Sequence, residues 1–409
     1  MTYKSAVIKR RIESVLIYPF LLLGKIMAPF FRLKSKHQLF IFCPSADIGG
    51  SIHVNADLCA CFADKSPLVI FSKKPKNNEF LHLFNIEGVT TIDLHKYVDN
   101  KLYHFVNIMF RSIVGSWINR TEHPVVVGGE SLYFYKVLPH IKKDAMRADI
   151  CHLNTWFNYS QAFVSEMDAR IFSTPQLKRD AEEWYRVNNV PSQCLQWLHF
   201  IDNKVDIPER NDSVNETLQV FFIGRGAPQK RVHIIASIAE KMNAINANVH
   251  FSFVGDVEKI IDTNGYSYAT FYGNIKDKTK MDAIYRTSDV LLLTSAYEGL
   301  PIAVMEMMAY GKVIVSTAVG GIPDYITTGK NGFLLANNPD ESKIIEEGLS
   351  VLTRLANNRT LLREVGRQSR LYAEEHFSGK VFCKNYSDVL FKKPETKQRP
   401  AQENYHTPS

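Results

Sequence analysis

The sequence predicts an α/β protein with two doubly wound domains, each a parallel sheet with helices on both faces. Short, continuously apolar runs of strand length alternate with segments of helical pattern along most of the 409 residues. A polar stretch at 201–216 contains a proline, lacks apolar periodicity and separates two such series. A chain of this length accommodates two or three domains that each bury their own core.

The composition is ordinary for a globular protein and disfavours nucleic acid as a ligand. Hydrophobic residues make up 45% of the chain and charged residues 22%, which is ordinary for a globular protein. The net charge of +7 is spread along the chain, so it favours an anionic ligand or a membrane surface without identifying either. Because basic residues form no dense stripe with interleaved aromatic residues, nucleic acid is a poor candidate.

The cysteines and acidic residues give no sign of a metal site. The chain has six cysteines, which are scattered and include neither a C-x-x-C motif nor a Cys/His cluster with zinc spacing. We therefore expect reduced thiols in a cytosolic compartment. No Asp-x-Asp occurs, so the commonest divalent-metal clamp for nucleotide sugars is missing, and we expect no metal and no cofactor.

An apolar segment, Ile12–Phe31, lies near the N-terminus between two groups of basic residues. No small-x-small cleavage site follows it, which argues against a cleaved signal peptide. Two prolines, a glycine and Lys25 interrupt the run of about 20 apolar residues that a spanning helix needs. A helix lying on an anionic membrane surface fits this pattern best, and a helix packed against the protein is the alternative.

The first domain is expected to begin with a strand at 39–44, a glycine turn at Gly49 and Gly50, and a helix. Paired glycines let a backbone approach a phosphate closely, although a tight turn after a strand can also require them. His152 ends one of the later buried strands, where a histidine is more often a packed residue than a catalytic one. The further strands are expected at 66–71, 89–94, 124–129, 148–153 and 169–174.

Two glutamates stand out in the second domain. Glu298 follows the buried strand at 289–294, and Glu306 lies eight positions later on a helix that begins with Pro301. This spacing is a little over two helical turns, so both carboxylates could face the rim of the sheet where open α/β sheets bind ligands. The N–H groups after Glu298 open a helix N-terminus, which attracts phosphate. Spacing alone fits a nucleotide-sugar site and two unrelated surface acids equally well.

The stretch E-G-L-P-I-A-V-M-E at 298–306 resembles the E-x7-E motif of family 4 glycosyltransferases, which are retaining enzymes of the GT-B architecture. The resemblance covers roughly Leu218–Tyr386, and the N-terminal half only in scattered places. It implies that Glu298 faces the transferred sugar and that Glu306 holds the nucleotide ribose. The motif residues between them that would bind the nucleotide sugar are Gly299, Leu300 and Pro301.

A second motif, at 224–230, resembles the family's G-R-x4-K-G sequence. It implies that Arg225 and Lys230 neutralise the donor diphosphate and stabilise it as a leaving group. The family's next residue is glycine, but this chain has Arg231, which either alters the loop or adds a third cation. The same resemblance implies that Ile275 contacts the nucleobase through backbone atoms.

The N-terminal half carries looser parts of the resemblance. Gly49 and Gly50 resemble a glycine loop near the donor diphosphate, and His152 resembles an active-site histidine that touches sugar hydroxyls. The expected divisions are a membrane-associating segment at 1–36, an acceptor-side domain at 37–200, a linker at 201–216, a nucleotide-sugar domain at 217–376, a helix crossing back to the first domain at 377–392, and a disordered tail at 393–409.

These features predict a retaining, metal-independent glycosyltransferase that moves a sugar from a nucleoside-diphosphate sugar to a glycan or lipid-linked glycan. The expected role is in cell-surface polysaccharide or lipopolysaccharide synthesis, with the protein on the cytoplasmic face of the cell membrane. The alternatives are an epimerase or a phosphorylase of the same architecture, and a non-catalytic sensor or membrane scaffold. The sequence identifies neither the sugar, the base nor the acceptor.

Overall fold

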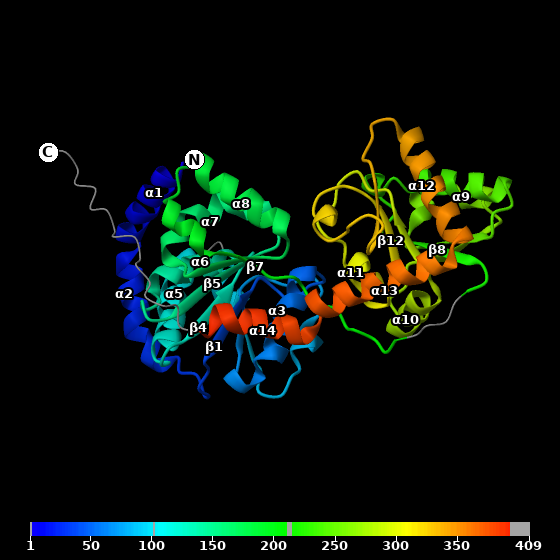
Figure 1. The fold of residues 1–409 in the computed structure, drawn as a ribbon. Helices are drawn as coiled ribbons and strands as arrows, with labels where there is room; N and C mark the ends of the chain where they lie inside the picture. The colour runs from blue at the N-terminus through cyan, green and yellow to red at the C-terminus, as the bar shows by residue number, and fades with distance from the viewer. Residues whose placement is uncertain (1, 101–102, 211–214, 393–409) are drawn as a thin grey trace. The chain divides into compact units, whose positions relative to one another are not determined.

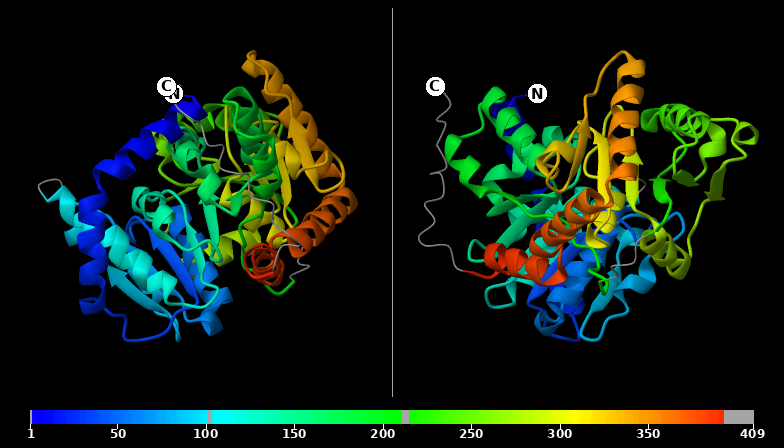
Figure 2. Two further views of the ribbon diagram at one scale, coloured as in Figure 1. Left: turned by 90° about the vertical axis from the view of Figure 1, so that its left-hand side faces the viewer. Right: turned by 45° about the vertical axis from the view of Figure 1, so that its right-hand side comes forward.

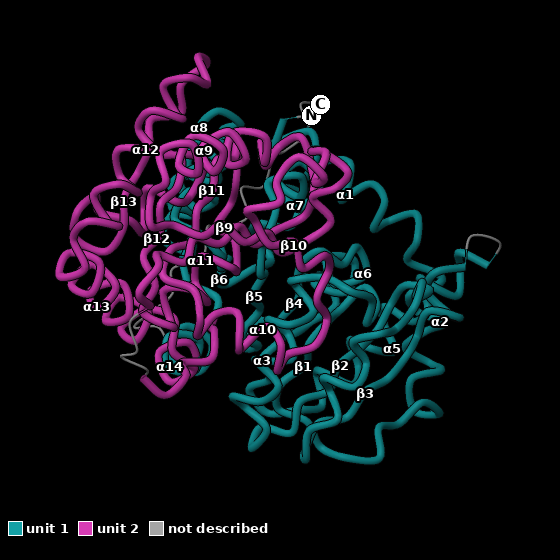
Figure 3. Tube along the Cα trace, turned by 90° about the vertical axis from the view of Figure 1, so that its right-hand side faces the viewer, with its two compact units in different colours: residues 1–203, 383–409 teal, residues 204–382 magenta. Residues whose placement is uncertain are grey.

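The computed structural model of the protein describes residues 2–100, 103–210 and 215–392. The chain divides into two compact units (Figure 3). Unit 1 contains residues 1–203 and the C-terminal stretch from 383, and unit 2 contains residues 204–382. Part of the expected linker, 211–214, and the expected tail at 393–409 lie outside the described residues.

Unit 1 is built on a seven-stranded parallel sheet with the strand order β3-β2-β1-β4-β5-β6-β7. The central strands are fully buried because both of their faces carry helices, and this explains their continuous runs of apolar residues. The strands are β1 (Leu39–Cys43), β2 (Leu68–Phe71), β3 (Thr90–Asp93), β4 (Val125–Gly128), β5 (Met146–Cys151), β6 (Ala169–Phe172) and β7 (Leu198–Phe200).

The helices of unit 1 cover both faces of this sheet (Figures 1 and 2). They form one hydrophobic core with the sheet, to which aromatic side chains contribute much of the volume. The helices are α1 (Tyr3–Leu16), α2 (Tyr18–Met27), α3 (Gly50–Cys61), α4 (His95–Val98), α5 (His104–Asn119), α6 (Leu132–Val137), α7 (Phe157–Ser160) and α8 (Pro175–Val187).

Unit 2 repeats the same winding with a six-stranded parallel sheet in the order β10-β9-β8-β11-β12-β13. In both units the order reverses beside the first strand, which gives a doubly wound fold with one switch point per sheet. The strands are β8 (Leu218–Ile223), β9 (Val249–Val254), β10 (Ala269–Gly273), β11 (Val290–Leu293), β12 (Val313–Thr317) and β13 (Gly332–Leu335).

Helices also cover both faces of the second sheet. α9 packs on α12, and α11 packs on α13, with these pairs on opposite sides of β12 (Figure 1). The two doubly wound sheets confirm the predicted α/β fold. The helices are α9 (Val232–Ala244), α10 (Lys278–Thr287), α11 (Ile302–Ala309), α12 (Glu341–Asn357), α13 (Arg359–His376) and α14 (Gly379–Leu390), of which α14 continues from unit 2 into unit 1.

The N-terminal apolar segment forms two helices rather than one. α1 and α2 meet at Ile17 with a bend of 59°, which is visible at the blue end of the chain in Figure 2. Among the described residues no single helix has the length and apolar character to cross a membrane, although this bent pair meets both criteria when its halves are counted together.

One face of the segment packs against unit 1. α2 lies along α5, and a side chain at Gly24 would clash with the backbone oxygen of Met109, 2.3 Å from the position of its Cβ. On α1, Arg10 forms an ion pair of 2.9 Å with Glu166. The glycine that interrupts the apolar run therefore permits close helix packing, and the opposite face of the segment stays exposed.

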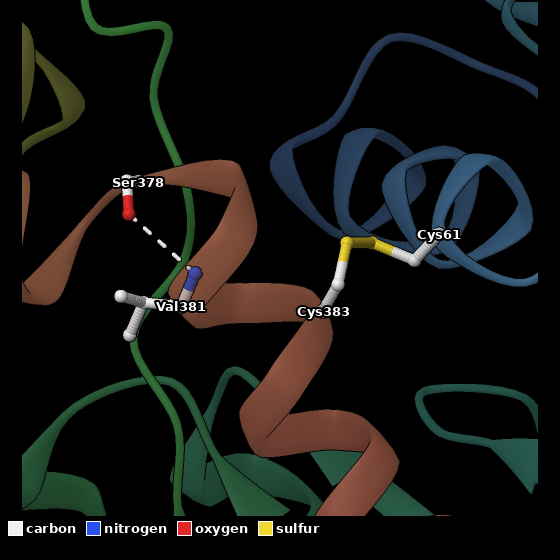
Figure 4. Close-up of a disulfide and its surroundings, with 4 residues drawn as sticks. All are labelled: Cys61, Ser378, Val381 and Cys383. Carbon is white, nitrogen blue, oxygen red and sulfur yellow. Dashed lines mark hydrogen bonds between the residues drawn. A yellow bond between two sulfur atoms is a disulfide. The ribbon is translucent and has the colours of Figure 1, made fainter.

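The expectation that all six cysteines are reduced thiols is wrong in this structure. Cys61 at the end of α3 and Cys383 on α14 form a disulfide, with Cα atoms 5.4 Å apart (Figure 4). The two residues are 322 positions apart, so no local spacing motif indicates that they pair. The bond ties the C-terminal helix to the first βα unit of unit 1.

A buried ion pair lies inside unit 1. Asp149 on β5 accepts hydrogen bonds from Arg170 on β6 at 2.9 Å and from the Tyr135 hydroxyl at 2.9 Å. All three side chains are almost completely buried. Because each buried charge has its partner, this network orders neighbouring strands without leaving an unpaired ion.

Candidate functional site

The switch point of unit 2 lies between β8 and β11, where the direction of strand order reverses. The loop after β8 carries Arg225 and Lys230, and the loop after β11 carries Glu298. Both loops leave the carboxyl ends of parallel neighbouring strands. The structure therefore places these predicted residues on the two loops where doubly wound sheets bind ligands.

Lys230 and Glu298 contact each other directly. The Lys230 ammonium donates a hydrogen bond to Glu298 Oε1, which also accepts one from the Ser295 hydroxyl at 2.6 Å. Both side chains of the ion pair are largely buried. A desolvated cation and carboxylate held in fixed positions form a preorganised electrostatic site, which can stabilise charge that develops on a ligand.

Arg231 occupies the position where the resembling motif has glycine. Its backbone has φ 46° and ψ 46°, in the left-handed region that favours glycine. Its guanidinium donates to the carbonyl oxygens of Thr294 at 2.7 Å and Ser295 at 2.9 Å, and to Asn337 Oδ1 at 2.8 Å. Arg231 thus keeps the loop conformation of a glycine, and its charge clamps the β8 loop to the end of β11.

The turn that holds Glu298 is backed by the loop after β12. Gly320 has φ 54°, and a Cβ there would lie 1.6 Å from the Glu298 carbonyl oxygen. The next N–H, that of Gly321, donates to the Gly299 carbonyl oxygen at 3.1 Å. Only glycine fits at position 320, so the glycine pair of the V-G-G-I sequence fixes the position of the Glu298 turn.

Glu306 lies on α11 and has a different partner. Its carboxylate accepts a hydrogen bond from the Tyr285 hydroxyl of α10, and it shares no partner with Glu298 among the hydrogen bonds of the described chain. Burial raises the pKa of Glu306, and the Tyr285 hydrogen bond opposes that shift. A half-buried carboxylate of this kind can accept hydrogen bonds from a diol.

The start of α11 differs from the prediction by one residue. Pro301 has ψ 133° and precedes the helix, which begins at Ile302. The expected first helical residue is therefore the residue that caps the helix. Gly299 and the half-buried Leu300 complete the turn, and a Cβ at Gly299 would meet nothing within 4 Å.

Two other predicted residues lie at the edges of this region. Arg225 is exposed and makes no hydrogen bond or ion pair with the residues that the structure describes. Ile275 lies between β10 and α10, and its side chain packs against a small cluster of Phe221, Val254 and Ile284. Arg225 is thus available to a ligand. The packing of the Ile275 side chain restricts the motion of its backbone.

The switch point of unit 1 lies between β1 and β4. Gly49 and Gly50 follow β1, and a Cβ at Gly50 would meet nothing within 4 Å. Gly49 has an extended backbone with φ 176°, and neither residue lies in the left-handed region, so the turn itself does not require glycine. Open space beside these two residues is the arrangement that lets a ligand approach the backbone closely.

Glu130, which the sequence analysis did not single out, lies beside this glycine loop and the predicted histidine. Burial raises its pKa, while the Ser51 hydroxyl and the His152 backbone N–H oppose the shift. Its backbone has φ 53°, a left-handed conformation that is strained for a residue other than glycine. Residues with such strained backbones are often found at functional sites. The signal in the sequence was a carboxylate directly after two glycines at the end of a buried strand.

His152 itself lies just beyond β5. Burial lowers the pKa of its imidazole to about 4, so the ring is neutral near pH 7. A neutral imidazole can donate to or accept from a hydroxyl group. Tyr285 and Ser295, the partners of the two glutamates, were also missed, because their roles depend on tertiary contacts that no local motif records.

Known families and solved structures resemble this chain in sequence and in fold. Residues 203–368 match the family described as "Glycosyl transferases group 1". The chain is 27% identical over 174 residues to an uncharacterized glycosyltransferase of Methanocaldococcus jannaschii, a match that covers 41% of this chain. The chain spans only 43% of that relative's length.

Two solved structures share the fold across nearly their whole chains. HepE of Anabaena, in complex with UDP, has a TM-score of 0.67 and 14% identity, covering 86% of this chain and 99% of that chain. The lipopolysaccharide outer core galactosyltransferase WaaB has a TM-score of 0.62 and 18% identity, covering 86% of this chain and 98% of that chain.

The chain therefore shares the α/β fold of these structures, the GT-B fold. Its match to the glycosyl transferases group 1 family is confined to residues 203–368.

Proposed function

We propose that the protein is a retaining glycosyltransferase that transfers a sugar from a nucleoside-diphosphate sugar to a glycan or glycolipid. The observation that carries this proposal is the buried contact between Lys230 and Glu298 at the unit 2 switch point, with Arg225 exposed on the same loop. The UDP named in the HepE structure supports a nucleoside diphosphate as the donor's leaving group.

Each residue has a proposed task in the transfer. Arg225 and Lys230 stabilise the negative charge that develops on the departing diphosphate. Glu298 orients the transferred sugar, and Glu306 accepts hydrogen bonds from the ribose hydroxyls. His152 contacts the sugar hydroxyls as a neutral imidazole.

The retaining stereochemistry is proposed from the resemblance of the 298–306 motif to retaining enzymes. A retaining reaction without an enzyme nucleophile requires the acceptor hydroxyl to attack from the face that the diphosphate leaves. The acceptor oxygen then forms the new glycosidic bond as the bond from the anomeric carbon to the phosphate oxygen breaks. The acceptor proton passes to the leaving diphosphate, so the step balances without a further reactant.

The cellular role we propose is cell-surface polysaccharide or lipopolysaccharide synthesis. The lipopolysaccharide galactosyltransferase of the same fold supports this choice. Within residues 2–100, 103–210 and 215–392, no three or more His, Cys, Asp or Glu side chains gather as a metal site would require. Metal independence stays a prediction, tested by an excess of chelator, which we expect to leave transfer intact.

The decisive test is a screen of nucleotide sugars by mass spectrometry, with extracted lipid-linked glycans as acceptors. With a donor that is active in this screen, Arg225→Ala should lower kcat/KM for transfer. The decrease should correspond to a loss of about 2–4 kcal/mol of transition-state stabilisation. Lys241→Ala, which removes an exposed lysine from α9, should leave transfer unchanged. Conversion of the donor without an acceptor would indicate an epimerase, and binding without turnover on any acceptor would indicate a sensor or scaffold.

We also propose that α1 and α2 hold the protein on the cytoplasmic face of an anionic membrane without crossing it. Residues 8–31 expose large apolar side chains along both helices and just beyond them. Exposed cations flank the apolar set, which suits acidic lipid headgroups. The apolar residues are Ile8, Ile12, Val15, Leu16, Tyr18, Phe20, Leu22, Leu23, Ile26, Phe30 and Phe31, and the cations are Lys9, Arg11, Lys25, Arg32, Lys34 and Lys36.

Point substitutions test this better than a deletion, because removal of the segment would uncover the α5 face on which α2 packs. We expect Leu16→Asp with Leu23→Asp to abolish sedimentation with vesicles of phosphatidylglycerol. The substitution Val187→Asp, at an exposed valine on α8, should not. Unchanged sedimentation of the double variant would contradict the proposal.

A further inference from the structure

Unit 1 contains a pocket of about 520 Å³ that the proposed function does not use. Its lining includes residues just beyond the carboxyl ends of four strands: Pro44 after β1, Ser72 after β2, Glu130 after β4 and Leu153 after β5. This rim is where open α/β sheets bind ligands. The volume lies within the range of small-molecule sites.

Two buried polar atoms of the lining residues have no hydrogen-bond partner within the described chain. The Tyr133 side chain is only 4% exposed, and its hydroxyl is unpaired. Glu130 Oε1 is likewise buried and unpaired. Such groups are costly to leave unsatisfied, so their presence together in one pocket indicates a polar ligand.

One side of the pocket carries positive charge. The half-buried Lys136 forms no hydrogen bond or ion pair within the described chain, and its pKa is lowered by burial and by Arg111 nearby. Arg111 is 3% exposed and has one unpaired nitrogen, Nη2. His104 also lines the pocket, and its pKa is lowered by partial burial, Lys136 and Arg111. A negative charge on the ligand would relieve the mutual repulsion of these groups.

The acidic side chains near these cations neutralise them only in part. Glu13 of α1 contacts Arg111 at 3.6 Å but is itself half exposed. Asp99 lines the pocket, and its carboxylate already accepts a hydrogen bond from the Lys74 backbone N–H at 3.0 Å. Glu130 is the remaining carboxylate of the lining.

The rest of the lining is apolar and aromatic. Trp156 is half buried, and Leu132 and Leu153 are exposed at this rim. An indole ring provides a flat apolar surface, which suits the C–H face of a pyranose ring. The pocket thus combines an apolar platform, a carboxylate that can accept hydroxyl hydrogens, and a cationic side.

We propose that this pocket binds a sugar residue that carries an anionic group, either a carboxylate or a phosphate. Lys136 and the Tyr133 hydroxyl bind the anion, Glu130 Oε1 accepts a hydrogen bond from a sugar hydroxyl, and Trp156 packs against the ring. Under the proposed function, on which this assignment rests, the bound sugar belongs to the acceptor, which is therefore an acidic glycan.

The test is saturation-transfer NMR and calorimetry on the full-length protein with three probes: methyl β-glucuronide, glucose 6-phosphate and methyl β-glucoside. At least one anionic probe should bind about tenfold more tightly than the neutral glucoside, the contribution of one hydrogen bond to a charged group. Preference for the glucuronide points to a uronic acid in the acceptor, and preference for the phosphate points to a phosphorylated sugar. Equal binding of all three probes, or no binding of either anionic probe, would overturn the inference.

Variants separate this pocket from the donor site. Lys136→Gln should weaken the favoured anionic probe about tenfold, and Tyr133→Phe should weaken it by a smaller factor. The matched control Lys241→Gln changes an exposed lysine of unit 2, outside the lining, and should have no effect. Affinity for UDP should be the same in all three variants.

The two proposals can therefore fail separately. Normal UDP binding with an unchanged probe affinity in Lys136→Gln would overturn the pocket assignment alone. Selective binding of an anionic sugar by a protein that binds no nucleoside diphosphate would overturn the donor site and leave the pocket assignment standing.

Discussion

Replacement of Arg231 tests how this chain tolerates a bulky residue where the resembling motif has glycine. The residue has φ 46°, and a non-glycine residue in that region costs about 1–2 kcal/mol. Its guanidinium makes three hydrogen bonds. Because the residue is partly exposed, we take about 1 kcal/mol for each bond, below the range for buried charged groups.

These values give an order of stabilities. Arg231→Gly loses the bonds, about 3 kcal/mol, but removes at least about 1 kcal/mol of strain, so it should be about 2 kcal/mol less stable than the parent. Arg231→Ala loses the bonds and keeps the strain, so its loss should be about 3 kcal/mol. The expected order is therefore arginine, glycine, alanine.

The tryptophans make the assay specific to one unit. All four lie in unit 1, at positions 117, 156, 184 and 197. In urea unfolding, the midpoint of the far-UV circular dichroism transition should be highest for the parent, lower for Arg231→Gly and lowest for Arg231→Ala. The midpoint of the tryptophan fluorescence transition should be the same in all three proteins. A glycine variant as stable as the parent would show that the three bonds contribute nothing. Equal stabilities of the glycine and alanine variants would refute the strain.

Three further predictions follow from contacts inside the units. Tyr285→Phe removes the hydrogen bond that opposes the raised pKa of Glu306. Glu306 should then become protonated at a higher pH, so nucleotide affinity should begin to fall at a higher pH as the solution is acidified. An affinity-versus-pH curve from calorimetry that does not move would refute this. Asp149→Asn leaves its arginine partner as an uncompensated buried charge and should destabilise unit 1 by about 3–5 kcal/mol, measured by tryptophan fluorescence in urea; a midpoint within error of the parent's would count against the buried pair. Reduction of the Cys61–Cys383 disulfide should destabilise unit 1 by about 2–4 kcal/mol in the same assay, and the Cys383→Ser variant should show that lower stability without reductant.

Much of the fold could be predicted because buried parallel strands read as continuous apolar runs. The six strands predicted for the first domain and the strand predicted at 289–294 are present, as β1 to β6 and β11. Two strands that were not predicted, β7 and β13, lie at sheet edges. β7 has only three residues and β13 begins with a glycine, so neither gives the pattern of a buried central strand.

The candidate site could be predicted only for those residues that lie within short sequence motifs. Glu298, Lys230 and Arg225 lie on short segments of fixed spacing, and the fold brings the first two into contact. Glu130, Tyr285 and the disulfide partners depend on which distant segments pack together, and periodicity carries no such information. The N-terminal segment was predicted as one helix, although Pro19 at the start of α2 was a signal that a new helix begins there.

In the proposed donor site, the loops after β8 and β11 bind the diphosphate of a nucleotide sugar. Calorimetric titration with UDP, ADP and GDP tests this claim directly, on the parent protein, Lys230→Gln and the control Lys241→Ala. We predict that at least one nucleoside diphosphate binds the parent, that Lys230→Gln weakens it about tenfold or more, and that the control binds like the parent. Equal affinity in Lys230→Gln and the parent, or no binding of any of the three to the parent, would contradict the claim.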